Sequence, residues 1–366
     1  MTIIKETAPY LRKKTSVSRM MIDVLIALLP VVVFSLVVNG IDAFRIISIS
    51  VLTMLIAEFI YVGVKNIMPY DGKKHTFVEK FKFAYSKYTI NNFLSPLVSA
   101  VIYAMILPAS VQWYAVMIGA LAGIVLGKLL FGGLGNNIFN PAAAGMVIAK
   151  ISFGSNFNYS NTWFYDVATG GTPLTALSTS FNNINSYSLL DLLIGKIPGT
   201  IGETCAICIL IGGVYLLIRR SADWRPVLAY LGTFTLMVLI AGICINSKMS
   251  NVGVFQFTAF ELLSGGVLFG AIYMITDPVT SPVSSPGRVM FGVIAAVITV
   301  FIRLFGAFPE GVGYSILIAN MLAPTIDYYK WSSSRFTWKK IVIILSIILV
   351  AGAIMVLGLL FGGVIK

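Results

Sequence analysis

The chain has 366 residues, of which 58% are hydrophobic and only 11% are charged. A soluble domain carries about 25% charged residues, so this composition excludes a soluble enzyme, with or without a single anchor. A helix that crosses a bilayer needs about 20 mostly apolar residues, and ten or eleven such helices would use roughly 200 to 220 positions. We therefore expect an all-α polytopic membrane protein.

Apolar runs along the chain predict eleven membrane spans. The first run has no small-residue cleavage site after it, so we interpret it as a span and not as a removable signal peptide. The spans are expected at about 20–38, 44–64, 93–108, 113–130, 138–153, 202–219, 226–245, 259–275, 289–305, 311–327 and 341–363.

The net charge of +12 could suggest a nucleic-acid partner, but the basic residues cluster in short segments between apolar runs, as the positive-inside rule predicts. With the N-terminus in the cytoplasm, 20 of the 26 Lys and Arg residues lie inside. No aromatic and basic groove of the kind that binds single strands occurs, so we expect no nucleic acid. The distribution indicates a multi-pass cell-membrane protein with a cytoplasmic N-terminus.

Two long polar stretches divide the chain. The segment 65–92 is basic and aromatic, which indicates an amphipathic segment at the cytoplasmic surface of the membrane. The stretch 154–200 lies outside in this topology, and long loops of this kind are often functional. The expected organisation is a cytoplasmic tail (1–19), a first membrane repeat (20–153), the external loop (154–200), a second repeat (201–330), and a linker with an extra C-terminal helix (331–366).

A weak internal repeat relates the two membrane segments. With five spans between equivalent elements, the halves would be inverted in the membrane, as in folds whose site lies near the midplane between broken helices. The matched pairs are Tyr103–Pro108 with Tyr273–Pro278, Lys128–Gly132 with Arg303–Gly306, and Asn140-Pro141 with Asn320–Pro324.

The most specific motif lies in the external loop, where Asp166, Thr169, Gly170, Gly171 and Thr172 stand in order. It resembles the flavinylation signature, in which a transferase joins FMN to a threonine hydroxyl as a phosphoester. The acceptor must be an accessible hydroxyl, and paired glycines let the backbone approach a phosphate closely. The alternative is an ordinary Gly-Gly-Thr-Pro turn.

Further segments, spread over about 20–330, resemble one family of membrane flavoproteins. That family contains the D subunit of the Rnf complex and the B subunit of the Na⁺-translocating NADH:quinone reductase. The segments are KLLFGGLGNNIFNPAAAG (128–145), GE (202–203), IGGVYLL (211–217), TDPVTSP (276–282), FGAFPEGVG (305–313) and LAPTID (322–327).

Between the two relatives, the chain looks more like the Rnf D subunit, because only about 19 residues precede the first span. Two features depart from the family. Gly171 replaces the usual Ala, which keeps the position small, and a further span follows the Pro-x-x-Asp motif that ends at Asp327. The resemblance implies ten or eleven transmembrane helices in two inverted five-helix repeats, similar to the urea-transporter-like fold.

The resemblance also implies a redox function. The chain would be a membrane electron carrier in a complex that couples ferredoxin:NAD⁺ electron transfer to translocation of Na⁺ or H⁺. Thr172 would carry FMN on the outer face, with Asp166, Thr169, Gly170 and Gly171 supporting the motif, and a non-covalent riboflavin could lie among the helices. NAD and ferredoxin would bind other subunits, because no strand-linked GxGxxG occurs here. The expected partners are those subunits, a second covalent-FMN subunit and the flavin transferase.

Ionisable groups inside the bilayer are costly and are candidates for function. Glu203 and Glu261 begin predicted spans, and an interfacial position or pairing explains them, as it does Lys128. Asparagines at a broken helix could bind a flavin or an ion, or could cap a helix. The candidates for a flavin pocket or ion path are Glu58, Lys128, Asn136, Asn137, Asn140 and Asp277.

We expect neither a catalytic side chain nor a metal site in the chain itself. Cys205 and Cys208 form a Cys-x-x-Cys on one helical face. Buried cysteines commonly act as small hydrophobes, while a cluster shared with another subunit is the alternative. His75, the only histidine, is interpreted as a solvated residue. Two other functions stay open: the quinone-reductase B subunit, and a small-solute transporter or channel without flavin.

Overall fold

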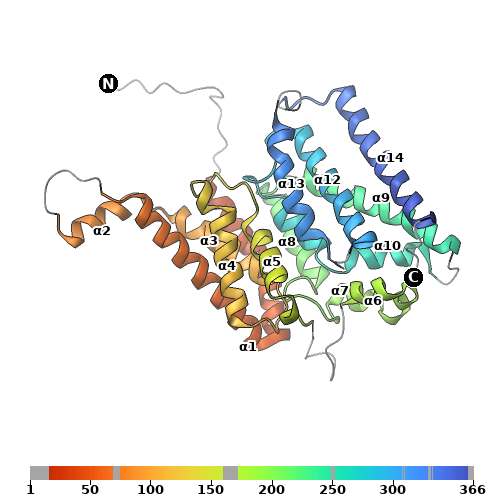
Figure 1. The fold of residues 1–366 in the computed structure, drawn as a ribbon, viewed down its shortest axis with the longest axis horizontal. Helices are drawn as coiled ribbons and strands as arrows, with labels where there is room; N and C mark the ends of the chain where they lie inside the picture. Colours follow the sequence, from red (N-terminus) through yellow and green to blue (C-terminus); the bar gives the residue numbers. More distant parts are fainter. Residues whose placement is uncertain are drawn as a thin grey trace.

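The computed structural model describes residues 16–68, 75–159, 172–248, 252–306, 308, 310–328, 331 and 333–361. These residues form helices and connecting turns, and no strand occurs among them. Figure 1 shows two neighbouring groups of helices, α1 to α5 and α9 to α14, and α8 contacts α1 of the first group and α11 of the second. The predicted all-α class is confirmed.

Helix α1 (Val17–Lys65) contains the first two predicted spans in 49 residues. Its regular geometry is interrupted at Gly40, which has φ 54° and ψ −128°. Only glycine adopts this backbone conformation without steric cost. The break falls between the spans expected at 20–38 and 44–64. Helix α1 therefore consists of two helical segments that meet at Gly40.

Helix α2 (Phe77–Tyr85) lies in the predicted amphipathic segment and extends away from the bundle in Figure 1. Thr76 and Glu79 form a capping box at its start, which satisfies two backbone N–H groups. The ring of Tyr85 stacks on Phe59 of α1 at 4.3 Å between centroids. A helix therefore lies in this segment, and the position of the segment at the cytoplasmic surface stays a prediction.

Helices α3 (Ile90–Met105), α4 (Trp113–Gly127) and α5 (Pro141–Ser152) complete the first group, with η1 (Leu129–Phe131) after α4. Glycines on α4 permit close contact with α5, because a Cβ atom at Gly123 would lie 2.4 Å from the Pro141 carbonyl oxygen. Small residues serve this purpose in membrane helix pairs. The 12 residues of α5 extend only about 18 Å, which is short of a bilayer's hydrocarbon core.

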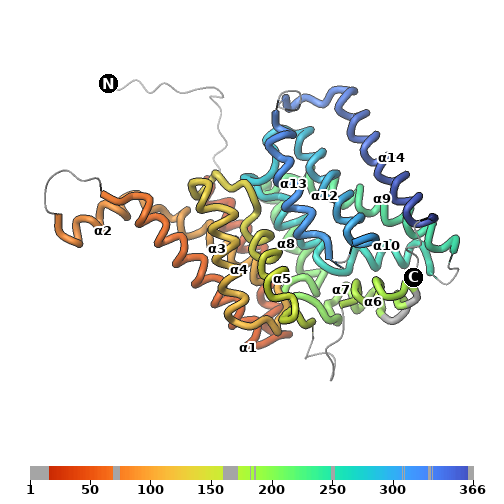
Figure 2. The backbone as a smooth tube through the Cα atoms, in the orientation of Figure 1, coloured from red at the N-terminus to blue at the C-terminus, as the bar shows by residue number. Residues whose placement is uncertain are grey.

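The rest of the chain is followed most easily in the tube of Figure 2. Short elements precede the second group, and α10, α11 and η4 form one interrupted helix. The elements are η2 (Gly154–Asn156), α6 (Pro173–Thr179), η3 (Phe181–Ser186), α7 (Leu189–Ile194), α8 (Ala206–Arg219), α9 (Trp224–Lys248), α10 (Val254–Leu263), α11 (Val267–Phe269), η4 (Gly270–Met274), α12 (Ser285–Phe305), α13 (Val312–Asp327) and α14 (Trp338–Phe361).

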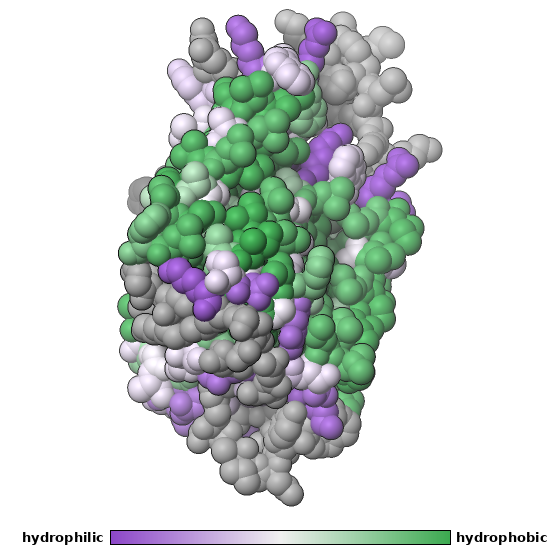
Figure 3. All heavy atoms as spheres, turned by 90° about the vertical axis from the view of Figure 1, so that its right-hand side faces the viewer, coloured by the Kyte–Doolittle hydropathy of each residue, from purple (hydrophilic) through white to green (hydrophobic). Residues whose placement is uncertain are grey.

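A helix lies at each of the eleven predicted span positions. Among the described residues, five helices are long and apolar enough to cross a membrane, and the pair α10 and α11–η4, bent by 59°, would make six. The five are α1, α4 with η1, α9, α12 and α14. Figure 3 shows a largely hydrophobic face, as a membrane protein requires. The count of ten or eleven crossings, the inverted symmetry and the urea-transporter-like arrangement stay predictions.

Candidate functional site

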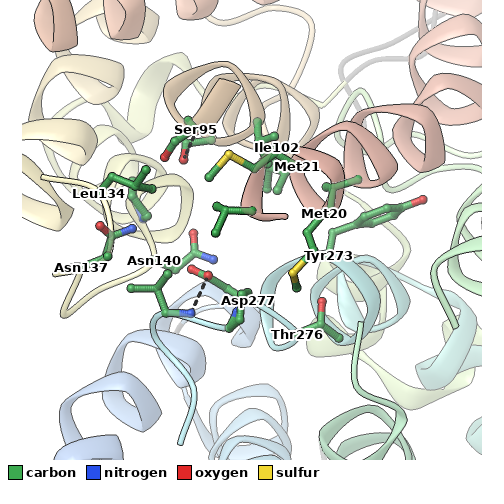
Figure 4. A pocket seen from close by; sticks show the side chains of 18 of the residues that line it. Met20, Met21, Ser95, Ile102, Leu134, Asn137, Asn140, Tyr273, Thr276 and Asp277 are labelled. Atoms are coloured by element: carbon green, nitrogen blue, oxygen red, sulfur yellow. Dashed lines mark hydrogen bonds between the residues drawn. The ribbon is translucent and has the colours of Figure 1, made fainter. Parts of the chain in front are cut away.

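A cavity of about 520 Å³ lies where the two helix groups meet. Its wall comes from the start of α1, from α3, from the loop before α5 and from the segment after η4. Figure 4 shows Asn137, Asn140 and Asp277 on one side of the cavity and Met20 and Tyr273 on the other. The structure therefore brings together three candidates from distant parts of the sequence.

Asn140 is the N-cap of α5, so the capping alternative is correct for this residue. Its Oδ1 accepts hydrogen bonds from the N–H groups of Ala142 and Ala143 at 3.0 and 3.2 Å. Its own backbone N–H donates to Oδ1 of Asn320 at 3.1 Å. The Asn320 amide in turn donates to the carbonyl of Thr280 at 3.2 Å. One buried amide therefore joins α5, α13 and the segment after η4.

Asn137 differs from its neighbours. Its Oδ1 is buried and has no hydrogen-bond partner in the described part of the chain, although the residue lines the cavity. A buried polar atom without a partner costs about 1–3 kcal/mol, so this oxygen is suited to accept a hydrogen bond from a ligand. Asn136 is exposed and does not line the cavity, so its expected place there is not supported.

Asp277 holds the turn that follows η4. Its carboxylate accepts hydrogen bonds from the Val279 N–H and the Thr280 hydroxyl, both at 3.1 Å. Asp277 also lines the cavity. Among the described residues that line the cavity, Asp277 is the one carboxylate, and no Lys or Arg is present. An anionic ligand would therefore meet a carboxylate and no basic side chain in this wall.

Lys128 and Glu58 form a buried ion pair beside the cavity. The Nζ of Lys128 lies 2.8 Å from Glu58 Oε2, and both side chains are at most 1% exposed. Lys128 also donates to the Ser95 hydroxyl at 3.0 Å, and Ser95 lines the cavity. The pairing alternative is therefore correct for Lys128, and neither charged group itself lines the cavity wall.

Thr172 is the only residue of the flavinylation motif in the described part of the chain; Asp166, Thr169, Gly170 and Gly171 lie outside it. The Thr172 hydroxyl caps α6 and accepts a hydrogen bond from the Thr175 N–H at 3.2 Å. The residue is only 4% exposed. The expectation of an accessible hydroxyl was wrong for this conformation, because the capping position buries it.

The start of α6 packs against a second buried ion pair. Arg303 on α12 pairs with Glu261 at 2.8 Å and donates to the Ser264 carbonyl at 3.1 Å. A Cβ atom at Gly265 would lie 2.6 Å from Leu174 and 3.0 Å from Arg303. Glu261 lies in the last turn of α10 and not at a span start, because α10 begins at Val254.

Several buried polar atoms in the second helix group lack hydrogen-bond partners within the described residues. These buried atoms without a hydrogen bond include Ser264 Oγ, Arg303 Nε and Tyr314 Oη. Glu203 packs against the same turn through Gly266 and accepts a hydrogen bond from Thr200 at 2.8 Å.

The sequence missed this outer cluster, defined here as Glu203, Glu261, Ser264, Arg303 and Tyr314. In the sequence, Arg303 enters only the charge count for the topology and the repeat match with Lys128. A basic residue and a carboxylate in two neighbouring spans were the available signal, since buried charges are usually paired. Which charges would pair depends on tertiary contacts that the sequence does not show.

Helical throughout its described residues and with several apolar spans, the molecule is a polytopic membrane protein. A sequence model of the NQR2, RnfD, RnfE family matches residues 4–334, so the chain belongs to this family. Helix α14 begins after the matched region, which agrees with the extra C-terminal helix expected from the sequence.

Curated relatives come from both branches of the family. The D subunit of the Na⁺-translocating ferredoxin:NAD⁺ oxidoreductase complex of Acetobacterium woodii is 30% identical over 92% of this chain and 93% of its own. The D subunit of the proton-translocating complex of Clostridium ljungdahlii is 30% identical over 88% and 93%. The B subunit of the Na⁺-translocating NADH-quinone reductase of Chromohalobacter salexigens is 39% identical, but over 63% of this chain and 57% of that protein.

Proposed function

We propose that the chain is the membrane electron-carrier subunit of an ion-translocating ferredoxin:NAD⁺ oxidoreductase. The proposal rests on how much of its relatives the chain covers. Two relatives with that named function align with it over 93% of their own length. The coupled ion is Na⁺ in one relative and H⁺ in the other. The chain would work in the cell membrane, with its N-terminus in the cytoplasm and the Thr172 loop on the outer face.

Within such a complex this chain would hold flavins, while other subunits would bind NAD and ferredoxin. We expect a second subunit with covalent FMN and a flavin transferase among its partners. Flavins accept and release one or two electrons, and the protein supplies their position and electrostatic surroundings. What this chain's own residues contribute can be argued at two places, the outer cluster and the cavity.

At the outer face, the Thr172 hydroxyl would form the phosphoester with FMN. The cluster next to α6 supports this assignment, because Ser264 Oγ, Arg303 Nε and Tyr314 Oη are buried without partners among the described residues and could hydrogen bond to a polar cofactor. Arg303 would contribute guanidinium N–H donors here, while Glu261 balances its charge. Since the hydroxyl caps α6, the first turn of this helix must open for the transferase.

In the cavity, an uncharged flavin fits better than a phosphorylated one. The described wall holds Asp277 and no basic side chain, so a phosphate would meet a carboxylate without a compensating cation. The volume lies within the range of small-molecule sites. Asn137 Oδ1 would accept a hydrogen bond from an N–H or O–H group of riboflavin, and apolar residues such as Met20 and Ile102 would contact its ring.

Ultraviolet fluorescence of the denatured band tests the covalent link. In cells that contain the transferase, the wild-type band should fluoresce and the Thr172→Val band should be dark. A dark wild-type band would exclude covalent FMN. Fluorescence that persists in the variant would move the attachment to Thr169 or Thr175 and contradict the assignment.

Extraction of flavin with acid tests the cavity. We expect riboflavin in the extract of the wild-type protein and its loss from Asn137→Leu, while the denatured band of the variant stays fluorescent. Asn136→Leu is the matched control, because this neighbouring amide is exposed and does not line the cavity. Equal riboflavin in all three proteins would show that Asn137 does not hold it.

The alternative function is that of the B subunit in an NADH:quinone reductase, which the 39% identity to the Chromohalobacter protein favours. Purification of the intact complex distinguishes the two. A complex that reduces NAD⁺ with reduced ferredoxin supports our proposal, and one that reduces quinone with NADH supports the alternative. A transporter or channel would contain no flavin by either assay.

A further inference from the structure

Two cysteines stand at the beginning of α8, outside both candidate flavin sites. Cys205 is the N-cap of the helix, and Cys208 lies in its first turn. Their sulfur atoms are 3.3 Å apart. Cys205 is buried, whereas Cys208 is partly exposed. The two thiols therefore contact each other and not only apolar side chains.

We propose that Cys205 and Cys208 are a redox-active dithiol that converts reversibly to a disulfide by thiol–disulfide exchange. The substrate class is a small or protein-borne disulfide that reaches Cys208. The proposal does not depend on the flavin assignments, because it rests only on the position and contact of these two side chains.

The backbone at this helix start favours the pair. Cys205 has φ −98° and ψ 98°, which is not helical, so its side chain is not restricted to the spacing of a regular helix turn. Cysteines in a Cys-x-x-Cys at a helix N-terminus gain thiolate character, because free N–H groups and the helix dipole stabilise negative charge. Helix α8 has 14 residues and is long enough to provide this field.

A metal site explains the pair less well. The described residues contain no group of three or more His, Cys, Asp or Glu side chains placed to hold a metal ion. The nearby Tyr273 hydroxyl donates to the carbonyl of Ala27 at 2.8 Å, so it is already occupied. A packing role alone accounts for buried Cys205, but it does not account for a sulfur contact with a partly exposed second thiol.

The exchange balances in two steps. The Cys208 thiolate attacks a disulfide R–S–S–R, which forms a mixed disulfide on Cys208 and releases one R–S⁻. The Cys205 thiolate then attacks Cys208 Sγ, which forms the Cys205–Cys208 bond and releases the second R–S⁻. The two protons from the protein thiols end on the two released R–SH molecules. The pair loses two electrons and the reagent gains them.

Oxidation to the disulfide would link the segment before α8 covalently to the first turn of this helix. Cys205 follows Glu203 of the outer cluster by two residues, and its backbone packs against Gly195 just after α7. A Cβ atom at Gly195 would lie 3.1 Å from the Cys205 backbone. The disulfide would therefore fix a junction between the external loop and a membrane helix.

Peptide mass spectrometry of the full complex in membranes tests the proposal. The membranes are treated with 2,2′-dipyridyl disulfide, remaining thiols are blocked with N-ethylmaleimide, and the protein is digested. Trypsin cuts after Lys196 and Arg219, so one peptide carries both thiols and Cys244 lies in another. In wild type we expect the 197–219 peptide to be lighter by two hydrogen atoms, with no added group, and dithiothreitol should restore both thiols.

Cys205→Ser removes the second attack. We expect this variant to accumulate the thiopyridyl group on Cys208 roughly tenfold or more above wild type, because the resolving step is intramolecular. The proposal is overturned if the wild-type peptide keeps a stable thiopyridyl group, if both cysteines end as maleimide adducts, or if the peptide is cross-linked to another chain. The wild-type measurement needs no variant, so misfolding of Cys205→Ser cannot decide the result.

Discussion

Each of the two buried ion pairs joins a basic residue at the end of one helix to a carboxylate on another. Lys128 pairs with Glu58, and Arg303 pairs with Glu261, each at 2.8 Å. Removing one member of a buried pair leaves an uncompensated charge, which is the costly case, whereas replacing both by apolar groups can be neutral. Each pair therefore fixes the relative position of two helices more than it adds net stability.

For the Lys128 pair, Glu58→Gln should lower the free energy of unfolding by about 3–5 kcal/mol, because the Lys128 ammonium loses its counter-charge in the protein interior. The double variant Glu58→Gln with Lys128→Met should recover most of that loss. Denaturant unfolding of the purified protein in detergent measures both. A double variant as unstable as the single one would contradict the explanation by unpaired charge.

The stability should also depend on pH through Asp223, which lies between α8 and α9. Partial burial acts to raise its pKa, but hydrogen bonds from the Arg225 N–H and the Arg288 guanidinium hold it below the ordinary value. Its contribution is therefore present above the ordinary carboxyl pKa and is lost as pH falls through the lowered one. Asp223→Asn should flatten this loss in melting curves taken from neutral to acidic pH. A variant whose melting temperature depends on pH as steeply as that of the wild type would contradict the assignment.

At the scale of elements, the contact between α4 and α5 depends on glycine. A Cβ atom at Gly123 would lie 2.4 Å from the Pro141 carbonyl oxygen and 2.8 Å from Gly145 Cα. Backbone atoms cannot rotate away as a side chain can, so the helices must separate. Gly123→Ala should therefore destabilise the protein by about 1–3 kcal/mol.

Gly232→Ala on α9 is the control for this prediction, because a Cβ atom there meets nothing within 4 Å. Glycine in a helix interior costs roughly 0.5–1 kcal/mol relative to alanine, so this change should be neutral or slightly stabilising. Thermal unfolding of the two variants side by side measures the difference. Similar melting temperatures would show that the close contact at Gly123 is not required.

Element positions were largely predictable, because a run of apolar residues in a membrane chain determines a helix almost alone. The C-terminal helix expected at 341–363 and the gap between the first two expected spans, where Gly40 interrupts α1, follow from apolar runs and their breaks. The predictions that were wrong concern local structure. Glu261 was placed at the start of a span, and the hydroxyl of Thr172 was expected to be accessible; helix starts and caps depend on contacts that apolar runs do not encode.

The cavity was predictable only in part. The sequence indicates Asn137 and Asn140 as amides at a broken helix and Asp277 as an ionisable group inside the bilayer, and the structure brings all three to one wall. Asn136 has the same chemistry one residue earlier but is exposed. Met20 and Tyr273, which complete the opposite wall, gave no signal of this kind. Apolar and aromatic lining residues resemble any core residue until tertiary packing is known.

At the scale of the whole molecule, the two helix groups meet through residues that the weak repeat had matched. The predicted repeat matches Asn140 with Asn320, and these residues hydrogen bond directly at 3.1 Å. It also matches Lys128 with Arg303, and each of them forms a buried ion pair. One lies beside the cavity and the other beside α6. An inverted repeat would produce this placement of one feature at each of two sites.

The amide of Asn320 is the most direct test of how the halves cooperate. It is 1% exposed, accepts from the Asn140 N–H and donates to the Thr280 carbonyl. Asn320→Leu keeps a similar volume but leaves two buried backbone groups without partners, each at about 1–3 kcal/mol. We expect a lower melting temperature together with loss of the extractable flavin, because Asn140 lines the cavity.

The covalent fluorescence of the same Asn320→Leu protein should persist, since the Thr172 hydroxyl and carbonyl hydrogen bond to Thr175 and not to Asn320. This combination separates a defect at the junction of the halves from general misfolding, in which both flavins would be lost. Asn136→Leu makes the same chemical change at an exposed site and should alter neither flavin. Retention of riboflavin by Asn320→Leu would mean that the cavity keeps its shape without the Asn320 hydrogen bonds that join the two helix groups.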